Sequence, residues 1–185
     1  MAHVVVPDAC VLVNAAVRDT ILRAAERDLI QVAWSQDILS EMTRALEQDL
    51  GLAADKSLKL RSEMEGAFAE NLVTGYEPLV PAMKNHPKDR HVLATAVVAG
   101  AGSIVTFNVR HFPENACGPY GIQVLEPDTF LLDLWNMWPD EVVSVLQGQA
   151  QDLSPAWSLE QLFVRLQRDV PLLVEAIRRS DKFNP

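Results

Sequence analysis

Hydrophobic residues recur every three to four positions through much of the chain, and short β-branched runs separate these stretches. Between residues 15 and 27, for example, Val17, Ile21 and Ala25 fall on one face of a helix. The other runs are short and largely apolar, which is typical of strands covered on both faces. They comprise residues 3–8, 29–34, 103–107 and 122–125. Strands that alternate with helices predict an α/β fold with a mainly parallel sheet.

Two amphipathic stretches in the first half of the chain predict a helical hairpin that turns near Gly51. Ser35 is suited to cap the first of these helices, and Asp37 then falls in its first turn. Apolar residues at intervals of four extend the second helix over residues 54–72. Glu41 lies at the edge of the apolar stripe of the first helix, so we expect it to be neither fully buried nor turned to water.

Residues 88–112 predict a helix, a glycine turn and a buried strand in close succession. Counted from Asp89, apolar residues follow at +3, +4, +7 and +8 before Gly100 ends the helix. Asn108 is expected to close the strand that covers residues 103–107. Asp89 therefore points along a buried stripe, where a carboxylate needs either a protein donor or a metal ion as its partner.

The C-terminal quarter of the sequence predicts helices only. Ser158 begins a capping-box pattern, and Pro171 is expected to kink or restart a helix. We therefore divide the chain into a domain of residues 1–138 and a helical extension of residues 139–185.

Composition narrows the classes of function. No apolar run is long enough to cross a membrane, and the N-terminus lacks a signal-peptide pattern, so we expect a cytoplasmic protein. Cys10 and Cys117 have neither zinc-site nor disulfide-framework spacing. The net charge of −9 argues against a broad nucleic-acid footprint. It leaves room for a small site in which a metal ion supplies local positive charge.

Four polar residues are placed where a site would form in such a fold. Asp8 and Asn108 follow predicted strands, whose carboxyl ends border the binding crevice of open α/β sheets, and Asp89 and Glu41 lie on adjoining helices. Three carboxylates that converge repel one another unless they bind a cation or protons. Oxygen ligands suit Mg²⁺ or Mn²⁺. The pattern thus indicates metal-assisted hydrolysis of a phosphodiester.

Three segments resemble the signature segments of PIN-domain ribonucleases, and most of all the toxins of VapBC-type toxin–antitoxin modules. They read VVPDACVLVNA, ILSEMTRAL and KDRHVLATAVVAGAGSIVTFNVRHFP. The resemblance implies a PIN-like three-layer fold with a five-stranded, mainly parallel sheet, and Mg²⁺- or Mn²⁺-dependent cleavage of RNA. It also implies a homodimer inhibited by a cognate antitoxin protein. The helical extension resembles one found in a subset of such toxins.

Carried over by position, the resemblance makes Asp8, Glu41 and Asp89 the metal-binding, catalytic acids. Asn108 stands where many members have a fourth acid, so a second metal ion is left open, although its amide can still orient a water or a phosphate. Four side chains next to the acids in sequence are either solvated surface or possible RNA contacts. These are Lys88, Arg90, Arg110 and His111.

Other readings of the same residues stay open at this point. Asp8 could be the nucleophile of an aspartyl phosphatase, but such enzymes usually want a second acid two residues later, where this chain has Cys10. Thr106 could hydrogen-bond Asp8. The spacing of His86, His91 and His111 fits no common zinc motif. The chain could also be a non-catalytic interaction module that binds a protein partner through its C-terminal helices.

Overall fold

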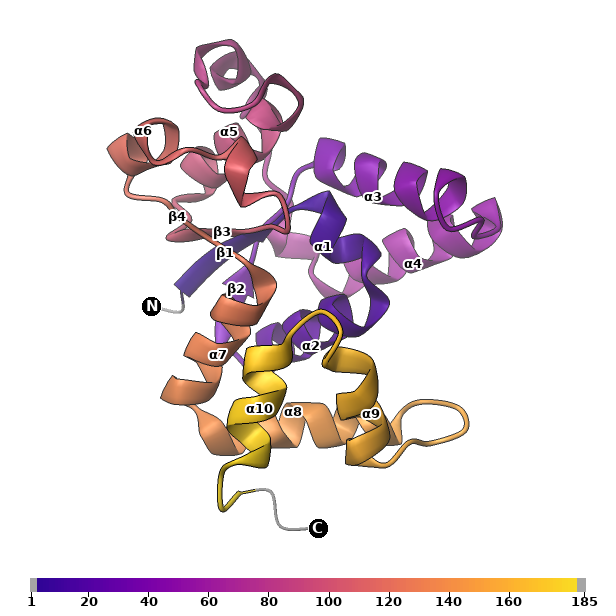
Figure 1. Cartoon of the computed structure of the whole chain (residues 1–185). Coiled ribbons are helices and arrows are strands. Elements are labelled where there is room, and N and C mark those ends of the chain that lie inside the picture. Colours follow the sequence, from indigo (N-terminus) through magenta and orange to yellow (C-terminus); the bar gives the residue numbers. More distant parts are fainter. Residues whose placement is uncertain (1–2, 183–185) are drawn as a thin grey trace.

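A single parallel sheet organises the computed structural model, which describes residues 3–182 (Figure 1). The spatial order of the strands is β2-β1-β3-β4, and every neighbouring pair is parallel. The strands are β1 (His3–Pro7), β2 (Ile30–Val32), β3 (Ser103–Val105) and β4 (Gln123–Leu125). The predicted α/β class with a mainly parallel sheet is therefore confirmed.

Ten α-helices join and follow these strands within the described residues. They are α1 (Ala9–Val13), α2 (Ala15–Glu26), α3 (Gln36–Gln48), α4 (Ala54–Ala67), α5 (Arg90–Ala99), α6 (Glu114–Cys117), α7 (Pro127–Met137), α8 (Pro139–Gln151), α9 (Leu159–Leu166) and α10 (Pro171–Arg178). In the part of the chain described here, no helix is both long and apolar enough to span a membrane.

The chain leaves β1 in one direction for β2 and then crosses back over β1 to reach β3. Right-handed crossovers place the helices of these two connections on opposite faces of the sheet. A crevice forms at such a reversal, outside the carboxyl ends of the two strands concerned. In this protein that crevice lies beyond the ends of β1 and β3.

The sheet has four strands among the described residues, so the expected count of five is wrong. In place of a fifth strand, Trp34 and Leu72 form a single parallel bridge. The Val73 N–H donates to the Trp34 carbonyl at 2.8 Å in this bridge. Two residues later Gly75 adopts a left-handed conformation with φ of 77°, which turns the chain away from the edge.

Two other sequence-based boundaries are also wrong. Helix α4 ends at Ala67 rather than at residue 72, because Phe68 leaves the helix and packs edge-on against the buried Trp34 ring, with centroids 5.7 Å apart. Strand β3 ends at Val105, so Asn108 does not close it. Asn108 instead precedes the short 3₁₀ turn η4 (Val109–His111).

Helix α5 is buried over its first two turns on every side, not only along one stripe. All six residues from His91 to Ala96 are buried. The helix packs on β1 and β3 with one side, and α3 and the 3₁₀ segment η2 (Glu77–Ala82) cover the others. Gly100 ends α5 with φ of 61°, a conformation that favours glycine. This burial fixes the N-terminus of α5, where Asp89 lies.

The C-terminal helices pack on the rest of the protein and lie beside α2 (Figure 1). Helix α8 is joined to α2 by a buried bond in which the Thr20 hydroxyl donates to Gln149 Oε1 at 2.7 Å. An Arg23–Asp152 ion pair at 2.9 Å adds to this interface. The predicted capping box at Ser158 is present, and Pro171 begins α10. The division at residues 138 and 139 stays a prediction.

A buried acid attaches α10 to α7. Asp128 is 8% exposed and accepts the N–H groups of Leu172 and Leu173, both at 3.0 Å. These two N–H groups belong to the first turn of α10, which has no partners for them inside the helix. Asp128 therefore caps a helix that begins more than forty residues away in sequence.

We expect Asp128→Ala to lower the free energy of unfolding by about 1 to 3 kcal/mol, since it leaves buried N–H groups without an acceptor. Chemical denaturation followed by circular dichroism measures the change. Asp133→Ala, on the exposed side of the same helix, is the control and should change stability by less than about 0.5 kcal/mol. Equal effects of the two substitutions would contradict the capping role.

Candidate metal centre

Asp8 is the first residue beyond β1 and lies at the crevice between β1 and β3. Its N–H donates to the Val105 carbonyl at 2.9 Å, which continues the pairing of β1 with β3. Its carboxylate accepts the Thr106 hydroxyl at 2.6 Å and the Cys10 thiol at 3.2 Å. The residue is only 3% exposed. The expected bond between Thr106 and Asp8 is therefore present.

The negative charge of Asp8 is poorly compensated. Burial raises the pKa of this carboxyl above its ordinary value of 3.8, and the nearby Asp89 raises it further. The hydrogen bonds from Thr106 and Cys10 oppose this shift without cancelling it. Within residues 3–182 no lysine or arginine forms an ion pair with Asp8. A bound cation would supply the missing charge.

Asp89 lies between the 3₁₀ turn η3 (Pro87–Asp89) and α5, and its side chain is 15% exposed. It forms no capping hydrogen bond to the first turn of α5. Its Oδ2 lies 2.7 Å from Nδ1 of His111 and 3.5 Å from Nδ1 of His86. The partners of this acid within the described residues are therefore imidazoles rather than backbone N–H groups.

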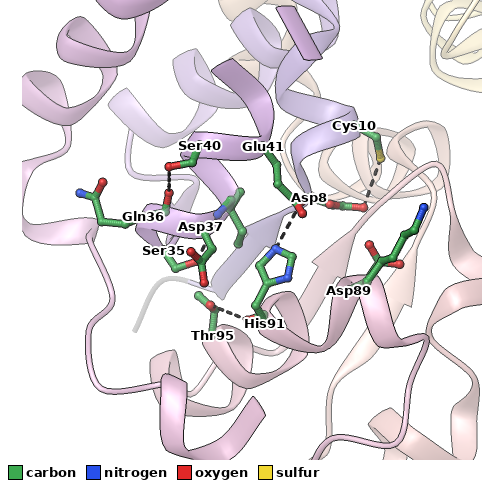
Figure 2. A network of polar contacts seen from close by, with 12 residues as sticks. Asp8, Cys10, Ser35, Gln36, Asp37, Ser40, Glu41, Asp89, His91 and Thr95 are labelled. Atoms are coloured by element: carbon green, nitrogen blue, oxygen red, sulfur yellow. Dashed lines mark hydrogen bonds and ion pairs between the residues drawn. The ribbon is translucent and has the colours of Figure 1, made fainter. Parts of the chain in front are cut away.

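Glu41 projects from α3 toward α5, where it faces His91 (Figure 2). Glu41 Oε2 lies 3.3 Å from His91 Nε2, which is an ion-pair distance without the geometry of a hydrogen bond. Burial lowers the pKa of His91, but the attraction of Glu41, with smaller contributions from Asp37 and Asp8, outweighs it and leaves the pKa above its ordinary value. Glu41 is half-buried, as its position on the helix predicted.

The three predicted acids point toward the same space in Figure 2. Asp89 acts electrostatically on Asp8, and Asp8 and Glu41 both act on His91, so the three carboxylates share one field. Oxygen donors with unneutralised charge fit Mg²⁺ or Mn²⁺. The assignment of Asp8, Glu41 and Asp89 as metal ligands stays a prediction.

Asn108 is held close to Asp8 by its backbone. Its N–H donates at 3.0 Å to the same Thr106 hydroxyl that donates to Asp8. Thr106 thus links Asp8 to the segment that carries Asn108. The proposed role of the Asn108 amide in orienting a water or phosphate stays a prediction.

The predicted RNA-contacting side chains differ in exposure. Lys88 and Arg110 are exposed, whereas Arg90 is half-buried and its Nε has no hydrogen-bond partner within the described residues. His111 is committed to Asp89. Of these four side chains, Lys88 and Arg110 are therefore the ones exposed enough to contact a phosphate chain beside the acids.

Sequence patterns missed the histidine partners of the acids. His86 and His91 carry no motif, and their partners are known only once η3, η4 and α3 are placed. One feature of the sequence did point to His91: a polar residue in the buried helix two positions after Asp89 needs a polar partner. Cys10 donates to Asp8, and burial raises its thiol pKa to about 12, which disfavours the thiolate form that a nucleophilic cysteine requires.

The raised pKa of Asp8 predicts that Asp8→Asn stabilises the metal-free protein at neutral pH. Because the unfolded chain ionises near 3.8 and the folded protein only at higher pH, ionisation of Asp8 removes stability as the pH rises through this window. Thermal unfolding in EDTA should show Asp8→Asn above wild type at pH 7, and the gain should vanish below about pH 3.8. Asp133→Asn, an exposed acid, serves as the control and should show no such gain. A variant less stable than wild type at pH 7 would contradict the uncompensated charge.

Comparison with known proteins gives two family matches, one in each part of the chain. The family described as PIN domain matches residues 4–110, and the family described as VapC50 C-terminal domain matches residues 127–179. The second match covers α7 to α10. A Mycobacterium tuberculosis (strain ATCC 25618 / H37Rv) protein named "Putative ribonuclease VapC50" is 42% identical over 106 residues.

The aligned region is 57% of this chain and 63% of that relative, so the similarity spans less than two thirds of the relative's length. The first family match contains Asp8, Glu41 and Asp89 together with β2, β3 and all but the first residue of β1. With four parallel strands between helices and a PIN match over more than half of its length, this chain belongs to the PIN-domain family.

Proposed function

We propose that this protein is a metal-dependent endoribonuclease and the toxin of a type II toxin–antitoxin system. The observation that carries the proposal is the buried Asp8 carboxylate, which faces Asp89 without a lysine or arginine partner among the described residues. The PIN-domain match and the ribonuclease name of the similar protein support the same activity.

In this proposal Asp8 and Asp89 hold one Mg²⁺ or Mn²⁺ ion, and Glu41 completes the group or positions the nucleophile. An ion bound by these residues would supply the positive charge that activates water and stabilises the phosphate. Thr106 holds the Asp8 carboxylate in one orientation through its hydrogen bond. His91 restrains the Glu41 carboxylate by an ion-pair contact. Cleavage would leave a 5′-phosphate and a 3′-hydroxyl.

The substrate is RNA in this proposal, bound beside the acids. Asp89 and His111 contact each other. Lys88 directly precedes Asp89 and Arg110 directly precedes His111, so both exposed cations lie close to this contact. Two cations next to the site can attract a phosphate chain although the whole protein carries a net charge of −9. Homodimer formation and a cognate antitoxin rest on the resemblance to VapC-type toxins.

The first test is cleavage of total cellular RNA by the purified protein with Mn²⁺ or Mg²⁺. We expect discrete products that require the ion, are absent in EDTA, and fall by about a hundredfold or more in Asp89→Asn and Glu41→Gln. A lost electrostatic contribution of several kcal/mol corresponds to a loss of this size. Mapping the ends of the products would identify the target.

Glu63→Gln is the matched control for Glu41→Gln, because Glu63 is an exposed acid on α4, away from the crevice. It should cleave at the wild-type rate. A folded protein that yields no products with either ion and also fails to bind Mn²⁺ would exclude the nuclease. The protein would then be the interaction module, a reading that the amide of Asn108 in place of a fourth acid favours.

The salt dependence of binding tests the placement of the RNA. We expect Lys88→Gln and Arg110→Gln each to weaken binding of a non-cleavable RNA and to reduce the slope of log K against log salt concentration by about 0.7. Fluorescence anisotropy measures both effects. Lys56→Gln, an exposed cation on α4 away from the crevice, provides the reference and should leave the slope unchanged. Unchanged slopes in the first two variants would place the RNA elsewhere.

A further inference from the structure

Two histidines from separate segments meet at one oxygen of Asp89. His86 precedes η3 and His111 ends η4, and their rings stack with centroids 4.2 Å apart and planes 15° apart. The Nδ1 atoms of both rings are turned toward Asp89 Oδ2, at 3.5 Å and 2.7 Å respectively. One potential ligand atom from each of the three residues lies within 4.8 Å of the other two.

The hydrogen bond that His86 accepts leaves a lone pair of its Nδ1 atom facing the Asp89 carboxylate. The Lys88 N–H donates to His86 Nδ1 at 3.3 Å, so this nitrogen is the acceptor and its proton is on Nε2. An acceptor nitrogen cannot also donate to Asp89 Oδ2, which lies 3.5 Å away. The two electron-rich atoms therefore face each other, and a cation bound between them would remove this repulsion.

The backbone holds the three side chains together before any ion binds. The His86 N–H donates to the His111 carbonyl, and the Asp89 N–H donates to the His86 carbonyl, both at 2.9 Å. The buried Asn85 amide donates to the Asp89 carbonyl at 2.9 Å. Ligands on preformed segments lose little conformational freedom when an ion binds, which favours affinity.

We propose that His86, Asp89 and His111 form a binding site for a transition-metal ion of the Zn²⁺ class. Two imidazole nitrogens and one carboxylate oxygen are ligands that suit Zn²⁺ and are poor for Mg²⁺. Tetrahedral ligands about 2.0–2.1 Å from zinc lie about 3.3 Å apart, and the His86–Asp89 pair already lies at 3.5 Å. To ligate an ion through Nδ1, His111 would carry its proton on Nε2, with the proton exchanged through solvent water.

The side chains of His86, His111 and Asp89 are 40%, 24% and 15% exposed, which gives an ion access from solvent and leaves room for water as a fourth ligand. Asp89 also belongs to the carboxylate group proposed for Mg²⁺ or Mn²⁺. The zinc site can nevertheless be tested apart from RNA cleavage, because the experiment measures binding of the ion itself.

Isothermal titration of the full chain with ZnCl₂, after removal of metal with EDTA, tests the proposal. We expect one ion per chain in wild type and at least a tenfold loss of affinity in His86→Ala and in His111→Ala, since even the loss of an outer-shell partner commonly costs tenfold or more. His3→Gln is the control, because His3 lies at the opposite end of β1 from Asp8 and should leave binding unchanged.

Two further variants separate the zinc site from the carboxylate group. Asp8→Asn should keep zinc binding, whether or not the protein cleaves RNA. If zinc binding is lost in Asp8→Asn but kept in the double variant His86→Ala/His111→Ala, the ion is held by the carboxylates and the proposal is overturned. Wild-type protein that binds no zinc also overturns it.

Cobalt provides a second measurement that does not rely on heat of binding. A four-coordinate Co²⁺ ion absorbs visible light more strongly than the octahedral aqueous ion, so the spectrum reports whether the ion occupies a tetrahedral protein site of the kind proposed for zinc. We expect this absorption in wild type and Asp8→Asn and its loss in His86→Ala. Circular dichroism of each variant checks that it is folded, and absorption retained in a folded His86→Ala would contradict the assigned ligand.

Discussion

The buried charge at the end of β1 is the constraint on which the arrangement around the crevice depends. Pairing of β1 with β3 places Asp8 beside Thr106 in a position almost closed to water. Desolvation disfavours the carboxylate there, and a hydroxyl and a thiol stabilise it only in part. A protein selected for stability alone would place an apolar residue at this position. The acid at this position instead leaves a buried negative charge that is only partly compensated.

Each of the other two acids meets an imidazole, and this arrangement differs from salt bridges with lysine or arginine. Glu41 faces His91, and Asp89 faces His111. Burial lowers the pKa of His91, but the attraction of Glu41 outweighs it and favours the charged imidazole. Unlike a guanidinium, an imidazole can lose its proton when a metal ion binds nearby.

The C-terminal helices are attached to the sheet domain by specific polar contacts as well as by apolar packing. Gln149 of α8 accepts from Thr20 and donates at 2.9 Å to the Ala16 carbonyl, so both polar groups of its amide are satisfied within α2. Asp128 binds the start of α10 in the same selective way. Because unsatisfied buried groups are costly, these bonds fix how the helices pack as well as strengthening the interface.

The sequence by itself determined the features that depend on neighbours along the chain. The 3.6-residue period located the helices, Ser35 and Gly100 marked helix ends, and β-branched runs marked the strands. The α/β class followed from their alternation, and the three acids were predicted as site residues from short segments. These features are predictable because capping, turn conformation and one-sided burial act within a few residues.

Only the tertiary structure decided which groups meet across long separations in sequence. The reduced edge strand at Leu72, the early end of β3 before Asn108, and the attachment of Asp128 to α10 all depend on contacts between distant elements. The meeting of His86 with His111 is of the same kind, because it needs η3 and η4 to be placed side by side by a backbone hydrogen bond. Sequence patterns carry no such information, since the energy of each contact depends on geometry that the whole fold creates.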